Sequence, residues 1–156
     1  MSKNLVYSNK SLRDLEKIKN KLIKKDYILR LIEEAGRIIS RALSKEEFQS
    51  TEVAFDIIQT GFKSTLGLDF SFFDAFSPED SLRLFTSDDL SAKSYIVGDF
   101  YNSLTQICER DEMSIDKNYY KDKALFFYNS ALNLNELEIT EEIQLKSKIE
   151  KLNGKN

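Results

Sequence analysis

Three pairs of adjacent carboxylates come nearest to a catalytic or metal-binding pattern in this sequence. They are Glu33-Glu34, Asp88-Asp89 and Glu141-Glu142. Helical bundles that bind metals combine Glu with Glu-x-x-His, and the 156-residue chain contains no His. The missing imidazole also removes the usual general base near neutral pH and the usual activator of a Ser or Cys nucleophile. We therefore interpret these pairs as solvated helix faces or helix caps, and we predict no cofactor and no enzymatic activity.

Cys108 is the only cysteine in the chain and so the only candidate thiol nucleophile. It follows Leu104 and Ile107 in an apolar stripe, and no His can activate it, so we predict a buried, inert thiol. A single cysteine excludes a disulfide within the chain, which favours a reducing compartment and a cytoplasmic location. No apolar run has the length of a signal peptide or of a membrane span, so we expect no membrane insertion.

The charge is distributed unevenly along the chain. Residues 1–45 contain 12 Lys and Arg against five Asp and Glu, whereas residues 46–116 contain four against 15. Such asymmetry can mark a binding arm, or the two segments can pack against each other. The cations of the basic front could also follow a phosphate backbone, although only Tyr27 lies nearby to stack on a base.

Helical periodicity runs from Leu12 to Leu152 and predicts an all-α fold of six or seven helices in antiparallel hairpins. The N-terminal helix is basic and has a narrow apolar stripe, and residues 28–42 have a broader one. The second stripe could begin a new helix at Asp26 or continue a helix from residue 11. We divide the chain into a basic amphipathic arm at 1–25, a helical-hairpin domain at 26–152 and a frayed tail at 153–156.

Capping signals predict where several helices begin and end. The capping box Ser44-Lys45-Glu46-Glu47 predicts a helix that Gly67 ends. Ser77 and Pro78 predict a short helix to about Phe85. The next helix is predicted to begin at Ser87 or Asp88 and to run through Cys108, and Thr140 is predicted to cap the last helix.

Four phenylalanines lie within seven residues, at Phe70, Phe72, Phe73 and Phe76. This density is too high for a solvated loop. It favours a short helix or turn that plugs the core, with an exposed patch for a partner as the alternative. Gly36 and Gly98 lie inside predicted helices, where glycine costs up to about 1 kcal/mol relative to alanine, so each is predicted to mark a tight helix crossing.

A weak internal repeat accompanies these helices. Ala54, Ile58 and Gly61 have the same small-large-small spacing as Ala124, Tyr128 and Ala131. This pattern resembles the tetratricopeptide repeat. The resemblance implies stacked antiparallel helical hairpins with a concave groove for a peptide or partner protein. The opening at residues 26–30 also resembles small bacterial helical proteins of unknown function.

We predict from these features a non-enzymatic protein–protein interaction module, with accessory nucleic-acid binding through the basic N-terminal helices as the alternative. The partner is predicted to be another protein or a second copy of the chain. The residues predicted to contact it are Leu12, Leu15, Ile18, Leu22, Lys24, Lys25, Arg30, Arg37 and Arg41. The competing interpretation places the helix of residues 1–25 within the core of the monomer.

Overall fold

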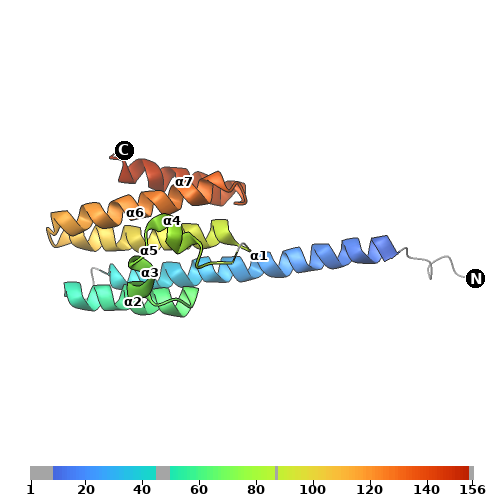
Figure 1. The fold of residues 1–156 in the computed structure, drawn as a ribbon, viewed down its shortest axis with the longest axis horizontal. Helices are drawn as coiled ribbons and strands as arrows, with labels where there is room; N and C mark the ends of the chain where they lie inside the picture. Colours follow the sequence, from blue (N-terminus) through green and yellow to red (C-terminus); the bar gives the residue numbers. More distant parts are fainter. Residues whose placement is uncertain (1–8, 45–49, 87, 155–156) are drawn as a thin grey trace, which may run out of the picture.

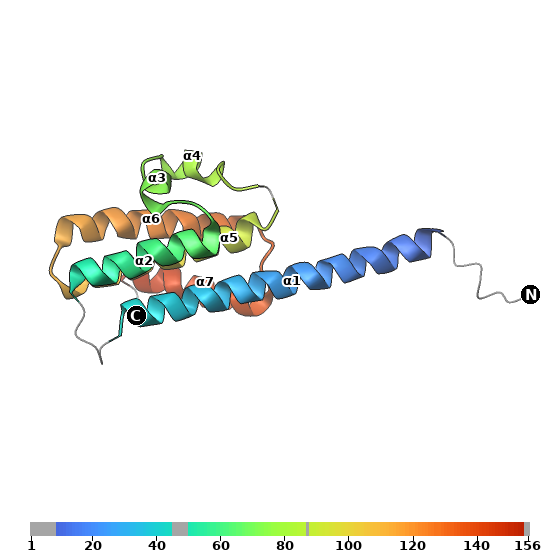
Figure 2. The same ribbon diagram turned by 90° about the horizontal axis from the view of Figure 1, so that it is seen from below.

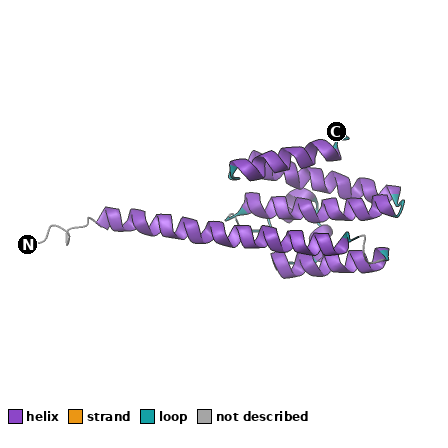
Figure 3. Ribbon diagram, turned by 180° about the vertical axis from the view of Figure 1, so that it is seen from behind, coloured by secondary structure: helices purple, strands orange, loops and turns teal. Residues whose placement is uncertain are grey.

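The computed structural model describes residues 9–44, 50–86 and 88–154, and every regular element in these ranges is a helix (Figure 3). The seven helices of the described residues are α1 (Asn9–Ala42), α2 (Thr51–Leu66), α3 (Phe70–Asp74), α4 (Pro78–Leu82), α5 (Leu90–Arg110), α6 (Ser114–Asn133) and α7 (Ile139–Leu152). The predicted all-α fold is thus confirmed for the part of the chain that the structure describes.

α1 is a single helix of 34 residues that passes through Asp26 without a break. At a rise of about 1.5 Å per residue it is roughly 51 Å long. Figures 1 and 2 show that its first half extends past the end of the other helices. Its buried side chains, Leu31, Ala35 and Ala42, all lie in the second half. Only that half packs on the body of the protein.

α5 is the central helix of the fold and contacts α1, α2 and α6. Phe100, Tyr101 and Ile107 on this helix are completely buried. The ring of Tyr101 stacks on Phe127 of α6, with the two ring centroids 5.7 Å apart. Figure 1 shows α6 lying along α5, with α7 on the far side of α6. Stacked aromatic side chains therefore fix the relative position of α5 and α6.

Two of the predicted helix ends are confirmed. Gly67 ends α2 in the left-handed region at φ 75°, and its N–H donates to the carbonyl of Lys63 at 2.8 Å. Ser77 caps α4 by accepting a hydrogen bond from the N–H of Asp80 at 3.2 Å. α4 ends at Leu82, before the predicted Phe85.

Three predicted helix starts are not confirmed, because two involve residues outside the described ranges and one is wrong. Residues 45–47 of the predicted capping box lie outside the described residues, and the described α2 begins after Ser50, which accepts from the N–H of Val53. Ser87 also lies outside the described residues, and α5 begins at Leu90. The predicted Thr140 cap is wrong, because α7 begins at Ile139 and places Thr140 inside its first turn. Leu137 packs against the core, which fixes the chain just before the helix.

The phenylalanine cluster divides between the core and the surface. Phe70 and Phe73 are buried, and both pack against Phe62 of α2. Phe72 and Phe76 are exposed and contact each other edge to face. The short helix α3 places residues three apart on the same side, so Phe70 and Phe73 enter the core together. The segment is therefore a core plug with two exposed rings.

The two glycine predictions have opposite outcomes. A Cβ atom on Gly98 would lie 2.4 Å from Cδ1 of Tyr128, so this glycine does mark a tight crossing of α5 and α6. A Cβ atom on Gly36 would meet nothing within 4 Å, and the prediction of a crossing there is wrong. The crossing of α1 and α2 is at Gly61 instead, where a Cβ atom would lie 2.3 Å from Cγ2 of Ile38.

Candidate interaction surface

The first half of α1 carries a row of exposed apolar side chains. Leu12, Leu15, Ile18 and Leu22, which we call the arm stripe, are between 53% and 60% exposed. Side chains of this type are normally covered in a folded protein, and single exposed ones need no explanation. Four in a row at helical spacing on one element form a continuous apolar surface.

The arm stripe does not lie on the core-facing side of α1. Each residue of an α-helix advances about 100° around the axis. On this geometry the arm stripe lies roughly opposite the face that carries Leu31, Ala35 and Ala42, which enter the core. In the first half of α1, the side of the helix that faces the core in the second half carries cations, including Lys10, Lys17 and Lys24. The arm stripe is therefore not an extension of the core-facing stripe of the same helix.

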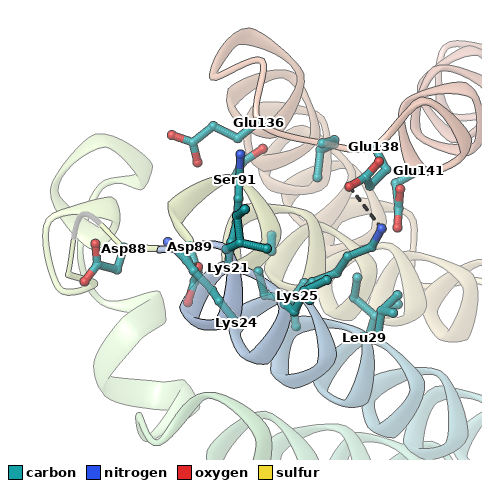
Figure 4. Close-up of a pocket in the computed structure, with 16 residues that line it drawn as sticks. Lys21, Lys24, Lys25, Leu29, Asp88, Asp89, Ser91, Glu136, Glu138 and Glu141 are labelled. Carbon is teal, nitrogen blue, oxygen red and sulfur yellow. Dashed lines mark ion pairs between the residues drawn. The ribbon is translucent and has the colours of Figure 1, made fainter. Parts of the chain in front are cut away.

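A groove of about 580 Å³ lies where α1 leaves the body. Its walls come from the middle of α1, the start of α5 and the segment that joins α6 to α7, as Figure 4 shows. Ile18 and Leu22 of the arm stripe line it, together with Leu29 and Ile32 of α1 and Leu137. The groove thus has apolar walls that are continuous with the arm stripe.

Two ion pairs connect α1 to the opposite wall of the groove. Lys24 lies 3.0 Å from Asp89 at the start of α5, and Lys25 lies 3.4 Å from Glu138 at the start of α7. The contact with the Asp89 carboxylate raises the pKa of Lys24 above its ordinary value. Lys25 and Glu138 are both more than half exposed, so their pair contributes little to stability, on the order of 1 kcal/mol or less. Lys24 is also about half exposed, whereas its partner Asp89 is only 12% exposed. The pairs orient side chains at the groove more than they hold the fold together.

The rim of the groove is acidic. Five carboxylates line it, those of Asp88, Asp89, Glu136, Glu138 and Glu141, against the three lysines Lys21, Lys24 and Lys25. Asp88, Glu136 and Glu141 form no ion pair within 4 Å with the described residues. The groove therefore presents apolar walls and an excess of negative charge to an incoming group.

The predicted arginines lie apart from this groove. Arg30, Arg37 and Arg41 are exposed and follow one another along a single side of α1. Arg37 and Arg41 line a second hollow of about 410 Å³ beside Gly61 of α2. The structure thus brings Lys24, Lys25, Ile18 and Leu22 together and separates them from the arginines, so the cations of α1 do not form one continuous patch.

Two partly buried carboxylates, those of Asp74 and Asp99, join helices of the body. Asp74 accepts hydrogen bonds from Tyr101 and from Lys123, both at 2.7 Å. Asp99 accepts from Tyr128 at 2.6 Å and from Lys148 at 2.8 Å, and burial raises the pKa of Asp99 above its ordinary value. Each carboxylate already has a cation and a phenol as partners. We therefore assign both clusters to the packing of α3, α5, α6 and α7.

Cys108 is completely buried, as predicted. Burial, with smaller contributions from Asp116 and Asp111, raises the pKa of its thiol to about 11. Since the thiolate is the reactive form, the thiol is unreactive at neutral pH. Among the described residues, no three His, Cys, Asp or Glu side chains gather in a way that could hold a metal ion.

The acidic rim was missed by sequence reasoning. Its carboxylates come from residues 88–89 and 136–141, nearly 50 residues apart, and only the packing of α1, α5 and α7 brings them to one groove. The pairs Asp88-Asp89 and Glu141-Glu142 were noticed, but no spacing signal connects one with the other. Three further exposed apolar residues of α1, Ile23, Tyr27 and Leu29, were also not predicted as contacts.

Comparisons with protein-family models, with curated proteins and with solved structures gave no significant match. Within the described residues, no helix is long and apolar enough to cross a membrane.

Proposed function

We propose that this chain is a non-enzymatic protein-interaction module that uses the first half of α1 as its contact helix. The observation that carries the proposal is the arm stripe, four apolar side chains more than half exposed on a helix that projects past the body. Covering such side chains supplies the main driving force of most protein associations. An amphipathic helix that meets a partner through residues three, four and seven apart is a common mode of recognition.

The resemblance to tetratricopeptide repeats supports the same class of function. In that interpretation α5 and α6 form one hairpin, and Gly98 beside Tyr128 is its small-large contact. Folds of this kind bind peptides and partner proteins rather than carrying out chemistry. The inference from the fold class is an analogy, and the arm stripe carries the proposal.

Nucleic-acid binding is the weaker proposal. It needs cations aligned along one surface, whereas Lys17 and Lys24 lie on one side of α1 and Arg30 and Arg37 on another. The cation side chains Lys24 and Lys25 are also already paired with carboxylates.

The test compares two triple variants in a pull-down from the native host. The first, Leu12→Gln/Leu15→Gln/Ile18→Gln, removes the arm stripe while keeping a residue that favours helix. The control, Val53→Gln/Phe72→Gln/Ile115→Gln, removes three side chains that are 49–86% exposed on α2, α3 and α6, none of which lines the groove. We expect the first variant to lose protein partners, including the chain itself, that the wild type and the control retain.

Two results would count against the proposal. If all three proteins capture the same partners in the same amounts, the arm stripe is not the contact surface. If the wild type instead binds DNA or RNA with a steep dependence on salt and captures no protein, the nucleic-acid alternative replaces it.

A further inference from the structure

The hollow between α1 and α2 is a second feature of the surface, separate from the groove. α2 lies along the second half of α1 (Figure 2). The hollow has a volume of about 410 Å³ and shares no lining residue with the groove. Its lining side chains from α1 include Arg37 and Arg41, and those from α2 include Thr60 and Ser64. Two arginines of one helix thus face two hydroxyl groups of the other.

The close crossing of the two helices fixes this arrangement. At Gly61 a Cβ atom would lie 2.3 Å from Cγ2 of Ile38, so α1 and α2 meet almost backbone to side chain. Thr60 and Ser64 are four residues apart on α2, and Arg37 and Arg41 are four residues apart on α1. Residues at this spacing are neighbours on one face of a helix. The crossing therefore holds both pairs beside the same hollow.

The two arginines have no anionic partner in the described part of the chain. Both are exposed, and neither forms an ion pair within 4 Å with a described residue. Glu33 and Glu34 lie four and three residues before Arg37, the spacing at which ion pairs form along a helix. Arg37 pairs with neither of them. The charge of both guanidinium groups is therefore left for an external anion.

Phosphate is the anion that this set of donors fits best. A guanidinium group presents parallel N–H donors to two oxygens of a phosphate. Two arginines one helical turn apart can reach two edges of the same tetrahedral group, whereas a carboxylate has only two oxygens and is satisfied by one arginine. The hydroxyl of Thr60 can donate to a remaining oxygen. Ser64 already donates to the carbonyl of Gly61 at 3.0 Å, so it lines the hollow without adding a donor.

Glu34 favours a single phosphate over a chain of them. Its carboxylate also lines the hollow, three residues before Arg37. Neighbouring phosphates of a nucleic-acid strand would bring further negative charge past Glu34, which would repel it. Arg30 does not line the hollow, so no row of cations continues beyond the pair. A phosphorylated side chain brings one group of charge near −2, and the N–H groups of its main chain can donate to Glu34.

We propose that this hollow binds a phosphorylated serine or threonine side chain of a partner protein, with Arg37 and Arg41 holding the phosphate. Clusters of arginine are a common means of recognising phosphorylated motifs. The inference goes beyond the proposed function, because the hollow lies on the second half of α1 and does not involve the arm stripe. Contact at the hollow depends on phosphorylation of the partner, whereas contact at the arm stripe does not.

The experiment titrates the full chain with the N-acetyl amides of phosphoserine and of serine. Binding is followed by NMR of the main-chain and arginine side-chain N–H groups, in phosphate-free buffer at constant ionic strength. We expect phosphoserine amide to bind saturably, with a Kd on the order of 1 mM from two charge-assisted contacts. It should shift the signals of Arg37, Arg41 and Thr60, and serine amide should shift none of them.

Three single variants locate the site. Arg37→Gln and Arg41→Gln should each weaken the binding of phosphoserine amide by at least about fivefold, because each removes a charge-assisted contact. The matched control Arg30→Gln removes the same charge from the same side of α1, about 10 Å along the helix from Arg37. It should change the Kd by less than about twofold at physiological ionic strength. Circular dichroism confirms that each variant is folded.

Several results would overturn the inference. If phosphoserine amide shifts none of these signals, the hollow is not a phosphate site. If Arg30→Gln weakens binding as much as Arg37→Gln, the effect is one of overall charge. If adenosine monophosphate or a short single-stranded DNA binds the same residues more tightly than phosphoserine amide, the ligand is not a phosphorylated protein. The variant Leu12→Gln/Leu15→Gln/Ile18→Gln should bind phosphoserine amide like the wild type, so failure at the hollow leaves the proposed function standing.

Discussion

Substituting alanine for three helical glycines tests the packing of the body in detail. The changes are Gly36→Ala, Gly61→Ala and Gly98→Ala. At Gly36 the new Cβ atom would enter open space. At Gly98 the new Cβ atom would lie 2.4 and 2.5 Å from two ring carbons of Tyr128. That ring cannot swing aside easily, because its hydroxyl donates to Asp99 at 2.6 Å and accepts from Asn102 at 3.3 Å.

The expected magnitudes follow from two opposing effects. Replacing a glycine inside a helix by alanine gains up to about 1 kcal/mol, because the unfolded chain loses freedom. Forcing an extra carbon into a packed interface costs about 1–3 kcal/mol. Gly36→Ala therefore gains about 0.5–1 kcal/mol, and Gly98→Ala loses up to about 2.5 kcal/mol once the gain is subtracted. Gly61→Ala meets Cγ2 of Ile38, a half-buried side chain, and should lie between the two.

Thermal melts at one fixed protein concentration measure these changes. For a domain of this size about 1 kcal/mol corresponds to roughly 2–4 °C in Tm. Gly36→Ala should raise Tm by about 1–4 °C and Gly98→Ala should lower it by up to about 10 °C. Urea titrations should give the same order of stabilities. If Gly36→Ala and Gly98→Ala shift Tm in the same direction, the close approach of α5 and α6 at Gly98 is wrong.

Three further predictions concern the buried polar groups and the arm. Asp74→Ala removes the carboxylate partner of Lys123, which is only 8% exposed, but leaves the hydrogen bond from Lys123 to the main-chain carbonyl of residue 74, so it should cost about 1.5–3 kcal/mol. Asp80→Ala loses an exposed pair with Arg83 and a carboxylate in the first turn of α4, and it should cost under about 1 kcal/mol in the same urea titrations; equal losses would contradict the assignment. Burial raises the pKa of Tyr101 and Tyr128 well above 10 and that of Tyr120 to about 12. In the unfolded chain these phenols lose their protons at a lower pH than in the folded chain. The stability that they contribute is therefore present below about pH 10 and is lost as the pH rises further. At about pH 11 the absorbance of phenolate should be much lower in the folded than in the unfolded chain. Deleting residues 1–25 removes exposed apolar side chains and the lysines of two ion pairs, and it leaves the carboxylate of Asp89, whose side chain is only 12% exposed, without Lys24. Circular dichroism should show a folded helical core with a modest loss of Tm while self-association is lost; an unfolded product would place the arm in the monomer core.

The sequence by itself determined the features that depend on neighbouring residues. The all-α fold follows from apolar spacing, and the ends at Gly67 and Ser77 follow from the backbone freedom of glycine and the hydroxyl of serine. The burial of Cys108 follows from its place in an apolar stripe. Each of these needs only a few residues within one or two helical turns, so the pattern in the sequence contains the cause.

Only the tertiary structure decided which glycine is crowded, which phenylalanines are buried and where the acidic rim lies. Gly36 and Gly98 have the same local setting, and they differ because Tyr128 from another helix reaches one and nothing reaches the other. The rim joins Asp88 with Glu141 because α5 and α7 begin beside the same stretch of α1. Contacts of this kind depend on how helices far apart in the sequence pack, and their energies are shared among many side chains, so no local spacing specifies them.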